Sequence, residues 1–399
     1  MKLKGALLAC AVVLSHAPAW AETTIRLGVL TDLSGPYADL SGRGSVIATE
    51  MAVEEFLEQN PGFTIEVLSA DHQNRPDVGS AILREWYDAR GVHAVVDVAS
   101  SAVALAASNI TRDANRVFLA SGPASSDITG SACSPNTIQW TYDTYALSRG
   151  TGTALAEAGG DRWFFLTADY AFGHAMERDT SHFVEAAGGT VLGQVRHPIN
   201  TPDFSSFLLQ AQASGANVVG LANAGADTIN AVKQASEFGL TSSGIRLAGL
   251  LVFITDVFSL GIDVAQGLVV TEAYYWDLND DTRAFAERFA ARMNGRMPSQ
   301  IHAGAYSATL HYLRAVAEAG SPEDGAGIVQ IMVATPTEDQ AFGTGSIRID
   351  GRKLHDMYLF EVKAPSESTS PWDLYTLLAT IPAEEAFRPL EESECPLVQ

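Results

Sequence analysis

Short apolar runs rich in β-branched residues alternate with helical periodicity along most of this chain, and this alternation limits the fold more than any other feature. Runs at 25–30, 63–68, 92–98 and 117–120 have the pattern of buried strands. Helical patterns at 45–59, 76–90 and 101–114 separate these strands. Strand–helix units of this length predict a parallel sheet covered by helices on both faces.

The same pattern starts again in the second part of the chain. A helix at 145–158 comes first, and strands at 162–167, 190–195, 217–221 and 245–248 follow with helices between them. A chain of 399 residues also exceeds the ~250–300 residues at which a single core usually stops growing. We therefore predict an α/β protein with two Rossmann-like lobes, each built on its own parallel sheet. Further along, residues 343–363 have the pattern of a β-hairpin that turns at Asp350-Gly351.

The first residues are predicted to be a secretion signal rather than part of the fold. Lys2 and Lys4 precede an apolar run at 5–14, which is too short to span a bilayer. Ala19-Trp20-Ala21 then has the pattern of a cleavage site, so we expect cleavage after Ala21. The mature chain would have 399 − 21 = 378 residues and would be a soluble exported protein. The alternative is a lipoprotein modified at Cys10, which we favour less because that cut would leave the A-x-A site unused.

The cysteine content agrees with export, and the net charge argues against nucleic acid as a partner. The formal net charge is −22, from 25 basic and 47 acidic residues, and loss of two lysines with the signal makes it −22 − 2 = −24. Such a surface repels phosphate backbones, which argues against nucleic-acid binding. Cys133 and Cys395 remain after cleavage, and we predict that they form a disulfide in an oxidising compartment. Two free buried thiols are the alternative.

Sequence signatures of catalysis are missing. The chain has no H-E-x-x-H, C-x-x-C, G-x-S-x-G or G-x-x-x-x-G-K-[ST] segment. The spacings of His174 with His182 and of His302 with His311 do not suit a metal pair on one helix. We therefore expect no metal, no cofactor and no enzymatic activity. An exported hydrolase whose catalytic residues come together only in the fold remains an alternative.

Four loops of small and hydroxyl residues follow predicted strands, where open α/β sheets bind their ligands. These loops are residues 32–38, 99–102, 121–126 and 168–173. Hydroxyl groups and free backbone N–H groups at a helix start suit a carboxylate or another acceptor. Tyr37 and Tyr170 are placed to close on a ligand from opposite lobes. For Ser100 and Ser101 an ordinary helix-capping role is equally compatible with the sequence.

At this point the sequence resembles a known family, the periplasmic solute-binding proteins of ABC importers, in the Leu/Ile/Val-binding group with the type I periplasmic binding fold. The resemblance is carried by I-R-L-G-V-L-T-D-L-S-G-P-Y from Ile25, D-V-A-S-S from Asp97, L-A-S-G-P-A-S-S-D-I-T from Leu119, D-Y-A-F-G around Tyr170, T-P-D-F-S-S-F from Thr201 and K-Q-A-S-E-F-G-L from Lys233. Together these segments cover nearly the whole mature chain. The family implies two lobes joined by a three-strand hinge, with a ligand held between them by hinge closure.

The resemblance also implies site residues. Ser100, with Ser101 beside it, would hold the ligand carboxylate from the first lobe, and Tyr37 would cover the entrance. The remaining implied contacts are backbone groups of the loop after residue 120, Tyr170, and residues of the far wall: Gly122, Pro123, Ala124, Tyr170, Asn223, Ala224 and Leu251. The family further implies that a small-molecule ligand and an inner-membrane ABC permease are the partners and that the chain is a monomer.

Two positions depart from the amino-acid-binding members of that family. Ala124 stands near a threonine position, and Leu251 stands near the acidic residue that holds the ligand ammonium in those members. A buried ammonium without an anionic partner is costly, so we expect a carboxylate or another small organic solute without an amine, aromatic solutes included. Asp169 or Asp227 remain as alternative anions for an amino acid. The aromatic run at 274–276 is interpreted either as ligand surface near the hinge or as lobe packing.

From the implied topology we expect residues 22–143 with 274–343 to form one lobe and residues 144–273 with 344–399 to form the other. The function we predict is capture of a solute for import. A periplasmic ligand-sensing module that signals to a membrane partner is the alternative that uses the same fold.

Overall fold

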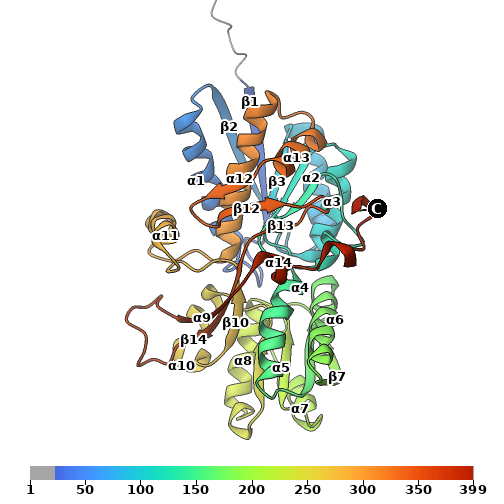
Figure 1. The fold of residues 1–399 in the computed structure, drawn as a ribbon, viewed down its shortest axis with the longest axis vertical. Helices are drawn as coiled ribbons and strands as arrows, with labels where there is room; N and C mark the ends of the chain where they lie inside the picture. The colour runs from blue at the N-terminus through green and yellow to red at the C-terminus, as the bar shows by residue number, and fades with distance from the viewer. Residues whose placement is uncertain (1–22, 399) are drawn as a thin grey trace, which may run out of the picture.

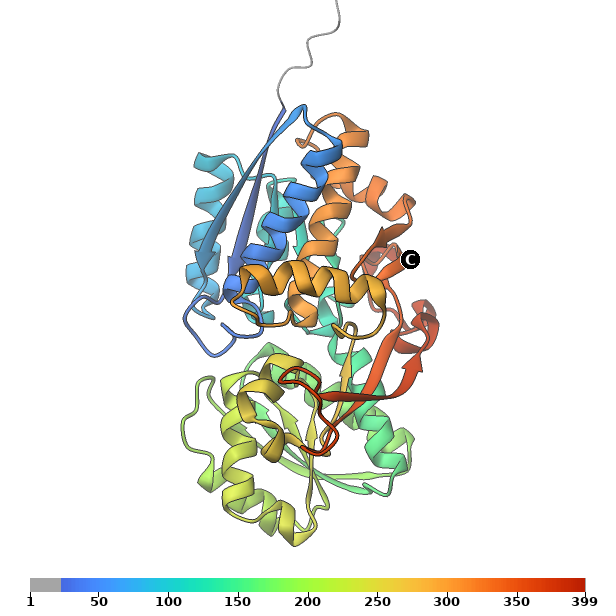
Figure 2. The ribbon, with the colours of Figure 1, turned by 90° about the vertical axis from the view of Figure 1, so that its left-hand side faces the viewer.

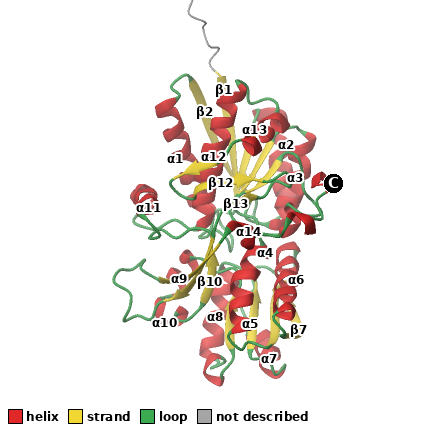
Figure 3. Ribbon diagram, viewed as in Figure 1, coloured by secondary structure: helices red, strands yellow, loops and turns green. Residues whose placement is uncertain are grey.

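The computed structural model describes residues 23–398, which form two lobes stacked end to end and connected by several strands (Figure 1). The predicted signal at 1–21, its cleavage site and Cys10 lie outside the described residues. Figure 3 shows that each lobe has strands at its centre and helices around them, as the alternating sequence pattern predicts.

The upper lobe is built on a five-stranded sheet of order β2-β1-β3-β4-β5, in which every neighbouring pair is parallel. Its strands are β1 (Thr23–Thr31), β2 (Phe63–Asp71), β3 (Ala94–Asp97), β4 (Val117–Ala120) and β5 (Thr137–Gln139). The side chains of β3, β4 and β5 are buried along their whole length, since helices cover both sides of the sheet.

One face of the upper sheet packs against α1 (Gly42–Gln59), α12 (Gln300–Ala319) and α13 (Gly325–Ala334). The other face packs against α2 (Pro76–Glu85) and α3 (Ser101–Asp113). Pro76 occupies the first position of α2, as the sequence predicts. The segment ends at Gly91, which has φ of 64° and follows the π-helical turn Trp86–Arg90. Helix α11 (Asp280–Arg292) also belongs to this lobe, since its residues Phe285 and Phe289 pack in the same core.

The lower lobe has a four-stranded parallel sheet of order β7-β6-β8-β9. Its strands are β6 (Arg162–Ala168), β7 (Thr190–His197), β8 (Val218–Ala222) and β9 (Arg246–Gly249). Helix α6 (Ala171–Ala186) packs on one side with α4 (Thr144–Leu147) and α5 (Thr153–Glu157). The other side carries α7 (Ser205–Ala213), α8 (Ala226–Glu237), α9 (Ile254–Leu260) and α10 (Ile262–Ala265).

Two small antiparallel sheets complete the fold. The strands β11 (Thr337–Asp339), β12 (Gly343–Ile347) and β13 (Lys353–Leu354) form one of them. The other has the order β10 (Val269–Glu272), β14 (Met357–Val362) and β15 (Tyr375–Ile381). A last helix, α14 (Ala383–Ala386), and two 3₁₀ turns at Leu390–Glu392 and Pro396–Val398 form the tail.

The predicted hairpin at 343–363 is right at its turn and wrong beyond it. Gly351 has φ of 83°, and β12 pairs with β13 on either side of the turn. After Leu354, however, the chain leaves the hairpin, and β14 pairs with β10 and β15 instead. An apolar strand pattern does not reveal its partner, and here two sheets compete for the same stretch.

The chain passes between the lobes at three places, which together form the hinge: after β5, after β10, and between β13 and β14. Because β12 pairs with β11, and Arg352 forms a bridge with Gln139 of β5, the residues from 344 to 354 lie beside the upper sheet. The third crossing thus follows Leu354, about ten residues after the expected division at 343/344.

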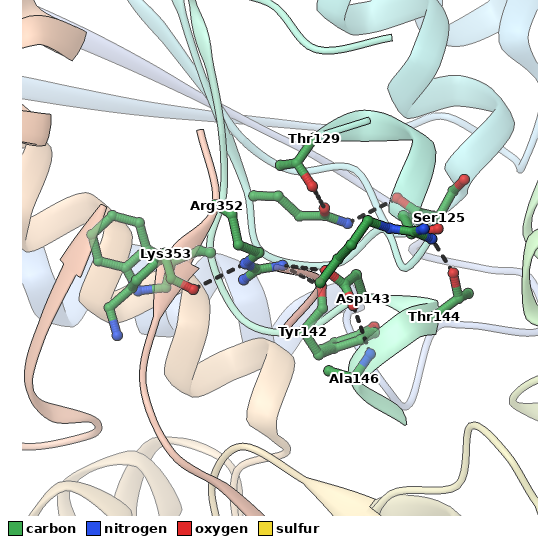
Figure 4. A network of polar contacts seen from close by, with 12 residues as sticks. Ser125, Thr129, Tyr142, Asp143, Thr144, Ala146, Arg352 and Lys353 are labelled. Atoms are coloured by element: carbon green, nitrogen blue, oxygen red, sulfur yellow. Dashed lines mark hydrogen bonds and ion pairs between the residues drawn. The ribbon is translucent and has the colours of Figure 1, made fainter. Parts of the chain in front are cut away.

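A buried polar network ties two of these crossings together (Figure 4). The fully buried guanidinium of Arg352 donates to the carbonyl of Tyr142 at 2.9 Å and lies 3.5 Å from the carboxylate of Asp143. The amide of Gln139 donates to the carbonyl of Pro123 at 3.1 Å and to that of Ser125 at the same distance. These bonds hold the hinge strands in register where they leave the upper lobe, although Nη2 of Arg352 has no hydrogen-bond partner.

The predicted disulfide is confirmed. Cys133 and Cys395 are bonded, with Cα atoms 5.6 Å apart and 262 positions between them in sequence. The bond fixes the C-terminal tail to the loop that follows β4. On its way there the tail touches the lower lobe, since Arg388 lies over the ring of Tyr145 and 3.5 Å from the carboxylate of Asp179.

Candidate functional site

A small cavity of about 10 Å³ lies between the lobes, at the carboxyl ends of both parallel sheets. This is close to the room that one water molecule requires, so the two lobes are closed on each other in this structure. Six of the ten residues that the sequence singles out line the cavity: Tyr37, Gly122, Ala124, Tyr170, Ala224 and Leu251. The upper and lower lobes thus contribute three residues each.

The loop after β1 positions Tyr37. Asp32 accepts the backbone N–H of Gly35 at 2.7 Å and that of Tyr37 at 2.9 Å, and its carboxylate is itself held by the amide of Asn74. A carboxylate bound by two backbone N–H groups of one turn fixes the course of that turn. The turn therefore presents Tyr37 toward the lower lobe without needing any contact from it.

Across the cavity Tyr170 precedes α6 in extended conformation, and its hydroxyl lies 2.6 Å from that of Tyr37. Burial raises the pKa of the Tyr37 phenol well above its usual value, and the neighbouring Tyr170 adds to the shift. Burial also raises the pKa of Tyr170. Both phenols are therefore neutral at physiological pH, so each can donate as well as accept a hydrogen bond.

Ser100 and Ser101 lie at the start of α3, where their roles differ. Ser101 accepts the backbone N–H of Ser125 at 3.1 Å, so its hydroxyl holds the loop after β4. The Ser100 hydroxyl is fully buried and has no hydrogen-bond partner, and it makes no capping bond to α3. An unpaired buried hydroxyl carries a desolvation cost. Ser100 is the neighbour in sequence of Ala99, which lines the cavity.

Two other sequence-predicted residues are occupied elsewhere. The carbonyl of Pro123 accepts the amide of Gln139 in the hinge network. The side chain of Asn223 lies 3.0 Å from the ring nitrogen Nε2 of His197 and accepts the hydroxyl of Thr228 at 2.7 Å. Neither residue lines the cavity in this closed state.

The alternative anions do not face the cavity. Asp227 accepts the backbone N–H groups of Asn200 and Thr201, and burial raises its pKa to about 6. Asp169 is half exposed and pairs with His174 at 2.9 Å. The far wall therefore consists of Ala224 and Leu251, which are both apolar and buried.

A buried carboxyl group lies below the floor of the cavity. Asp97 is fully buried, and a Cβ atom added at Gly122 would stand 2.2 Å from its Oδ1 atom. Its Oδ2 atom accepts the hydroxyl of Ser41 at 2.5 Å, whereas Oδ1 has no partner. Burial raises the pKa of Asp97 to about 6, so this group is partly protonated near neutral pH.

Five residues of the cavity were not among the predicted contacts. Ala99 and Phe172 lie within the predicted ligand-binding loops, whereas Leu40, Tyr142 and Ile301 lie outside them. Tyr142 follows β5 and donates its hydroxyl to the carbonyl of Gly122 at 2.6 Å. Its position just after a strand of the parallel sheet was the available signal. Ile301 lies at the start of α12, far along the chain, with no local pattern that marks it.

The aromatic run at 274–276 packs inside the lobes. Tyr274 belongs to the upper core and Tyr275 to the lower one, and both are buried. Within residues 23–398 no cluster of His, Cys, Asp and Glu could hold a metal ion. No helix in this part of the chain is long and apolar enough to cross a membrane.

Known proteins are similar to this chain in both sequence and fold. Residues 24–368 match the periplasmic binding protein family. The Leu/Ile/Val-binding protein homolog 6 of Brucella melitensis is 27% identical over 380 residues, which cover 92% of this chain and 94% of that protein. A solved periplasmic binding protein from Burkholderia mallei is 46% identical, with a TM-score of 0.92, and the match covers 94% of this chain and all of that one.

A second solved relative is a branched chain amino acid ABC transporter periplasmic ligand-binding protein from Burkholderia xenovorans LB400. It is 39% identical, with a TM-score of 0.82, over 94% of this chain and 100% of that one. The family match covers far more than half of the chain, and these relatives are binding proteins, not enzymes. The two lobes, the cavity between them and these similarities together place the chain in the periplasmic binding protein family, as a type I ligand-binding component of ABC transporters.

Proposed function

We propose that this protein captures a small organic solute that carries a carboxylate and no amine, and that it delivers this solute to an inner-membrane ABC permease. The solute would enter between open lobes and be enclosed as the hinge closes. Site residues from both lobes would contact it, with Tyr37 at the entrance and Ser100 at the carboxylate. We further propose that the protein acts as a monomer in the periplasm after cleavage behind Ala21.

The observation that carries this proposal is the apolar lining of the cavity at Ala124 in the upper lobe and Leu251 in the lower lobe. Ala124 and Leu251 are 2% and 4% exposed, and each stands where an amino-acid binder would need a polar or acidic group. The tyrosines are the ionisable groups among the lining residues, and both Tyr37 and Tyr170 are neutral phenols. An ammonium group enclosed here would lose its hydration and find no anion among the lining residues, which is unfavourable.

The upper lobe has, beside the cavity, groups that suit a carboxylate. The hydroxyl of Ser100 is buried and has no partner, and it lies at the N-terminal end of the 13-residue helix α3. Backbone N–H groups at a helix start favour negative charge, and a hydroxyl beside them adds a donor. Asp97 is compatible with an anionic ligand in its protonated form, which its raised pKa favours.

Solved proteins of the same fold offer ligands of both kinds. A solute-binding protein from R. palustris, 20% identical with a TM-score of 0.80, holds benzoate. The fold is thus able to enclose an aromatic carboxylate. The Burkholderia xenovorans relative is named for branched chain amino acids, and for that reason the presence or absence of the amine is the property to test.

Identification of the solute that leaves the protein on unfolding tests the proposal. Mature protein is purified from the periplasm without added ligand and unfolded, and the released small molecules are identified by mass spectrometry. We expect a carboxylic acid without an α-amino group, and its return to refolded protein should raise the melting temperature. A free α-amino acid as the released compound would contradict the proposed solute class. N-terminal sequencing of the same sample tests cleavage and should begin at Glu22.

A further inference from the structure

The N-terminus of α8 in the lower lobe has no cap of its own. Gly225 occupies the N-cap position and, having no side chain, makes no capping bond to the helix. Helices usually begin at Ser, Thr, Asp or Asn, whose side chains accept one of the free N–H groups of the first turn. The only carboxylate of this first turn, Asp227, faces away and binds the N–H groups of Asn200 and Thr201.

The missing acceptor comes from the other lobe. The backbone N–H of Ala226, the first residue of α8, donates to the carbonyl oxygen of Pro36 at 3.1 Å. Pro36 belongs to the loop after β1, which Figure 2 shows in dark blue below the upper lobe and facing the lower one. A carbonyl of the upper lobe thus takes the place of a capping side chain only while the lobes are closed.

Glycine at position 225 is required by this contact in two ways. Its φ of 57° and ψ of −131° form a conformation that L-residues rarely adopt. In addition, a Cβ atom at this position would stand 2.2 Å from the Pro36 oxygen and 3.1 Å from the ring of Tyr37. The first requirement belongs to the lower lobe in any state, whereas the second exists only in the closed state.

The acceptor is prepared before closure. Asp32 holds the N–H groups of Gly35 and Tyr37, which flank Pro36 on both sides, and all these groups belong to the upper lobe. Proline fixes its own φ, which stiffens the turn further. The carbonyl of Pro36 therefore points at α8 without any ordering cost at the moment of closure.

We propose that Pro36 caps α8 across the cleft, and that Gly225 is the positioning residue that permits the lobes to reach the closed state. This inference concerns the closure on which the proposed function rests, but it does not depend on which solute is bound. The two ideas can therefore fail separately, and the test below uses no solute.

The closed state can be measured by cross-linking across the cleft. The Ser259 hydroxyl of α9 lies 3.5 Å from the carboxylate of Asp39 in the loop after β1, so the pair D39C and S259C brings two thiols together only on closure. The native cysteines are bonded to each other and do not compete. A short bifunctional thiol reagent is added to ligand-free protein, and the rate of cross-linking is divided by the rate with a monofunctional reagent of the same chemistry.

Three further substitutions are compared on that background. Gly225→Ala should lower the normalised cross-linking rate by about tenfold or more, because the closed state loses a hydrogen bond and gains a steric overlap. Ala226→Pro replaces the N–H group by a ring carbon at a helix position that accepts proline, and it should lower the rate about fivefold or more. Gly215→Ala is the matched control, since Gly215 has φ of 79° with no neighbour within 4 Å of an added Cβ atom. It should lose comparable thermal stability and keep its cross-linking rate.

The inference is overturned if Gly225→Ala and Ala226→Pro cross-link as fast as the parent pair. It is also overturned if Gly215→Ala slows cross-linking as much as Gly225→Ala, because backbone strain would then account for the effect. A parent pair that does not cross-link at all would show that the closed contact between Pro36 and Ala226 does not form in solution. Circular dichroism of each variant confirms that the rates compare folded proteins.

Discussion

The hydroxyl groups of Tyr37 and Tyr170 lie 2.6 Å apart and join the two lobes directly over the cavity. Tyr37 comes from the loop after β1, and Tyr170 comes from the position before α6. Because the two residues belong to different lobes, this hydrogen bond requires the lobes to be closed. We propose that it helps to hold the entrance shut. It is the contact that most directly relates closure of the lobes to retention of a solute.

Loss of either hydroxyl should weaken retention. We expect Tyr37→Phe and Tyr170→Phe each to raise the dissociation rate of the co-purifying solute by roughly fivefold, the equivalent of about 1 kcal/mol for one buried hydrogen bond. The double variant should cost little more than either single one, since both remove the same bond. Stopped-flow measurement of solute release checks this.

A matched control for these variants is Tyr312→Phe. The hydroxyl of Tyr312 is buried in the upper lobe and has no hydrogen-bond partner, so its loss leaves the cleft unchanged. The Tyr312→Phe variant should release the co-purifying solute at the same rate as the native protein. Strictly additive effects of the two cleft substitutions would contradict a direct bond between Tyr37 and Tyr170.

A single substitution should change the class of solute. Leu251→Glu places an acid at the apolar wall, where it can pair with an ammonium, so leucine should gain affinity and a carboxylate without an amine should lose it. Leu251→Gln introduces a side chain of the same shape as Glu but without its charge, so this variant should not bind leucine. Isothermal titration of both variants with leucine and 4-methylpentanoate checks this. Equal leucine binding by the Glu and Gln variants would argue against an electrostatic role of this position.

The disulfide should contribute strongly to stability. A bond that closes a loop of 262 positions restricts the unfolded chain by on the order of 5 kcal/mol, as an upper guide. We expect the double variant C133S/C395S to unfold at clearly lower urea concentration than the native protein. Thiol titration of the unfolded native protein should find no free thiol in the mature chain. Two reactive thiols there, or an unchanged urea midpoint, would contradict this expectation.

Lys353 should make stability depend on pH. Its ammonium group is fully buried without a hydrogen-bond partner, and it lies over the rings of Trp140 and Phe342. Burial lowers its pKa to about 7, although Asp339 opposes the shift. The unfolded chain keeps the ordinary lysine value near 10.5, so between these values only the unfolded state binds the proton. Stability from this group is therefore complete above pH 10.5 and declines as the pH falls toward 7.

Lys353→Met should remove that dependence. We expect the variant to be more stable than the native protein at pH 7, with the difference shrinking as the pH rises to 9.5. Lys233→Met is the control, because Lys233 is an exposed residue of α8. Urea unfolding at a series of pH values measures both. A difference between Lys353→Met and native protein that stays constant from pH 7 to 9.5 would show that Lys353 is not neutral in the fold.

The alternating pattern predicted the lower parallel sheet and four of the five strands of the upper one, because buried strands between helices leave a strong local signal. The strand β5 (Thr137–Gln139) was missed, since it is only three residues long. The strand β15 was not predicted, since five of its seven side chains are exposed and its sequence lacks the apolar alternation of the others. The path of β14 was mispredicted because its local sequence fits a hairpin equally well. Only the competing pairing with β10 decides between them, and pairing over 80 residues or more is not written in local sequence.

The site shows the same limit. Tyr37 and Tyr170 could be named because they follow strands whose carboxyl ends meet, and a resemblance supplied Leu251. Ile301 and Leu40 reach the cavity only through the packing of α12 on the upper lobe, which no spacing reveals. The buried Arg352 and Lys353 were also missed, since charged residues are normally expected on the surface.

Comparison of two solutes that differ only in the α-amino group tests the central claim most directly. Leucine and 4-methylpentanoate share the same carbon skeleton and carboxylate, as do phenylalanine and 3-phenylpropanoate. Isothermal titration of ligand-free mature protein with all four compounds measures what the amine contributes to binding. The apolar wall at Ala124 and Leu251 predicts tighter binding of the member without the amine in each pair. Tighter binding of leucine or phenylalanine would contradict it.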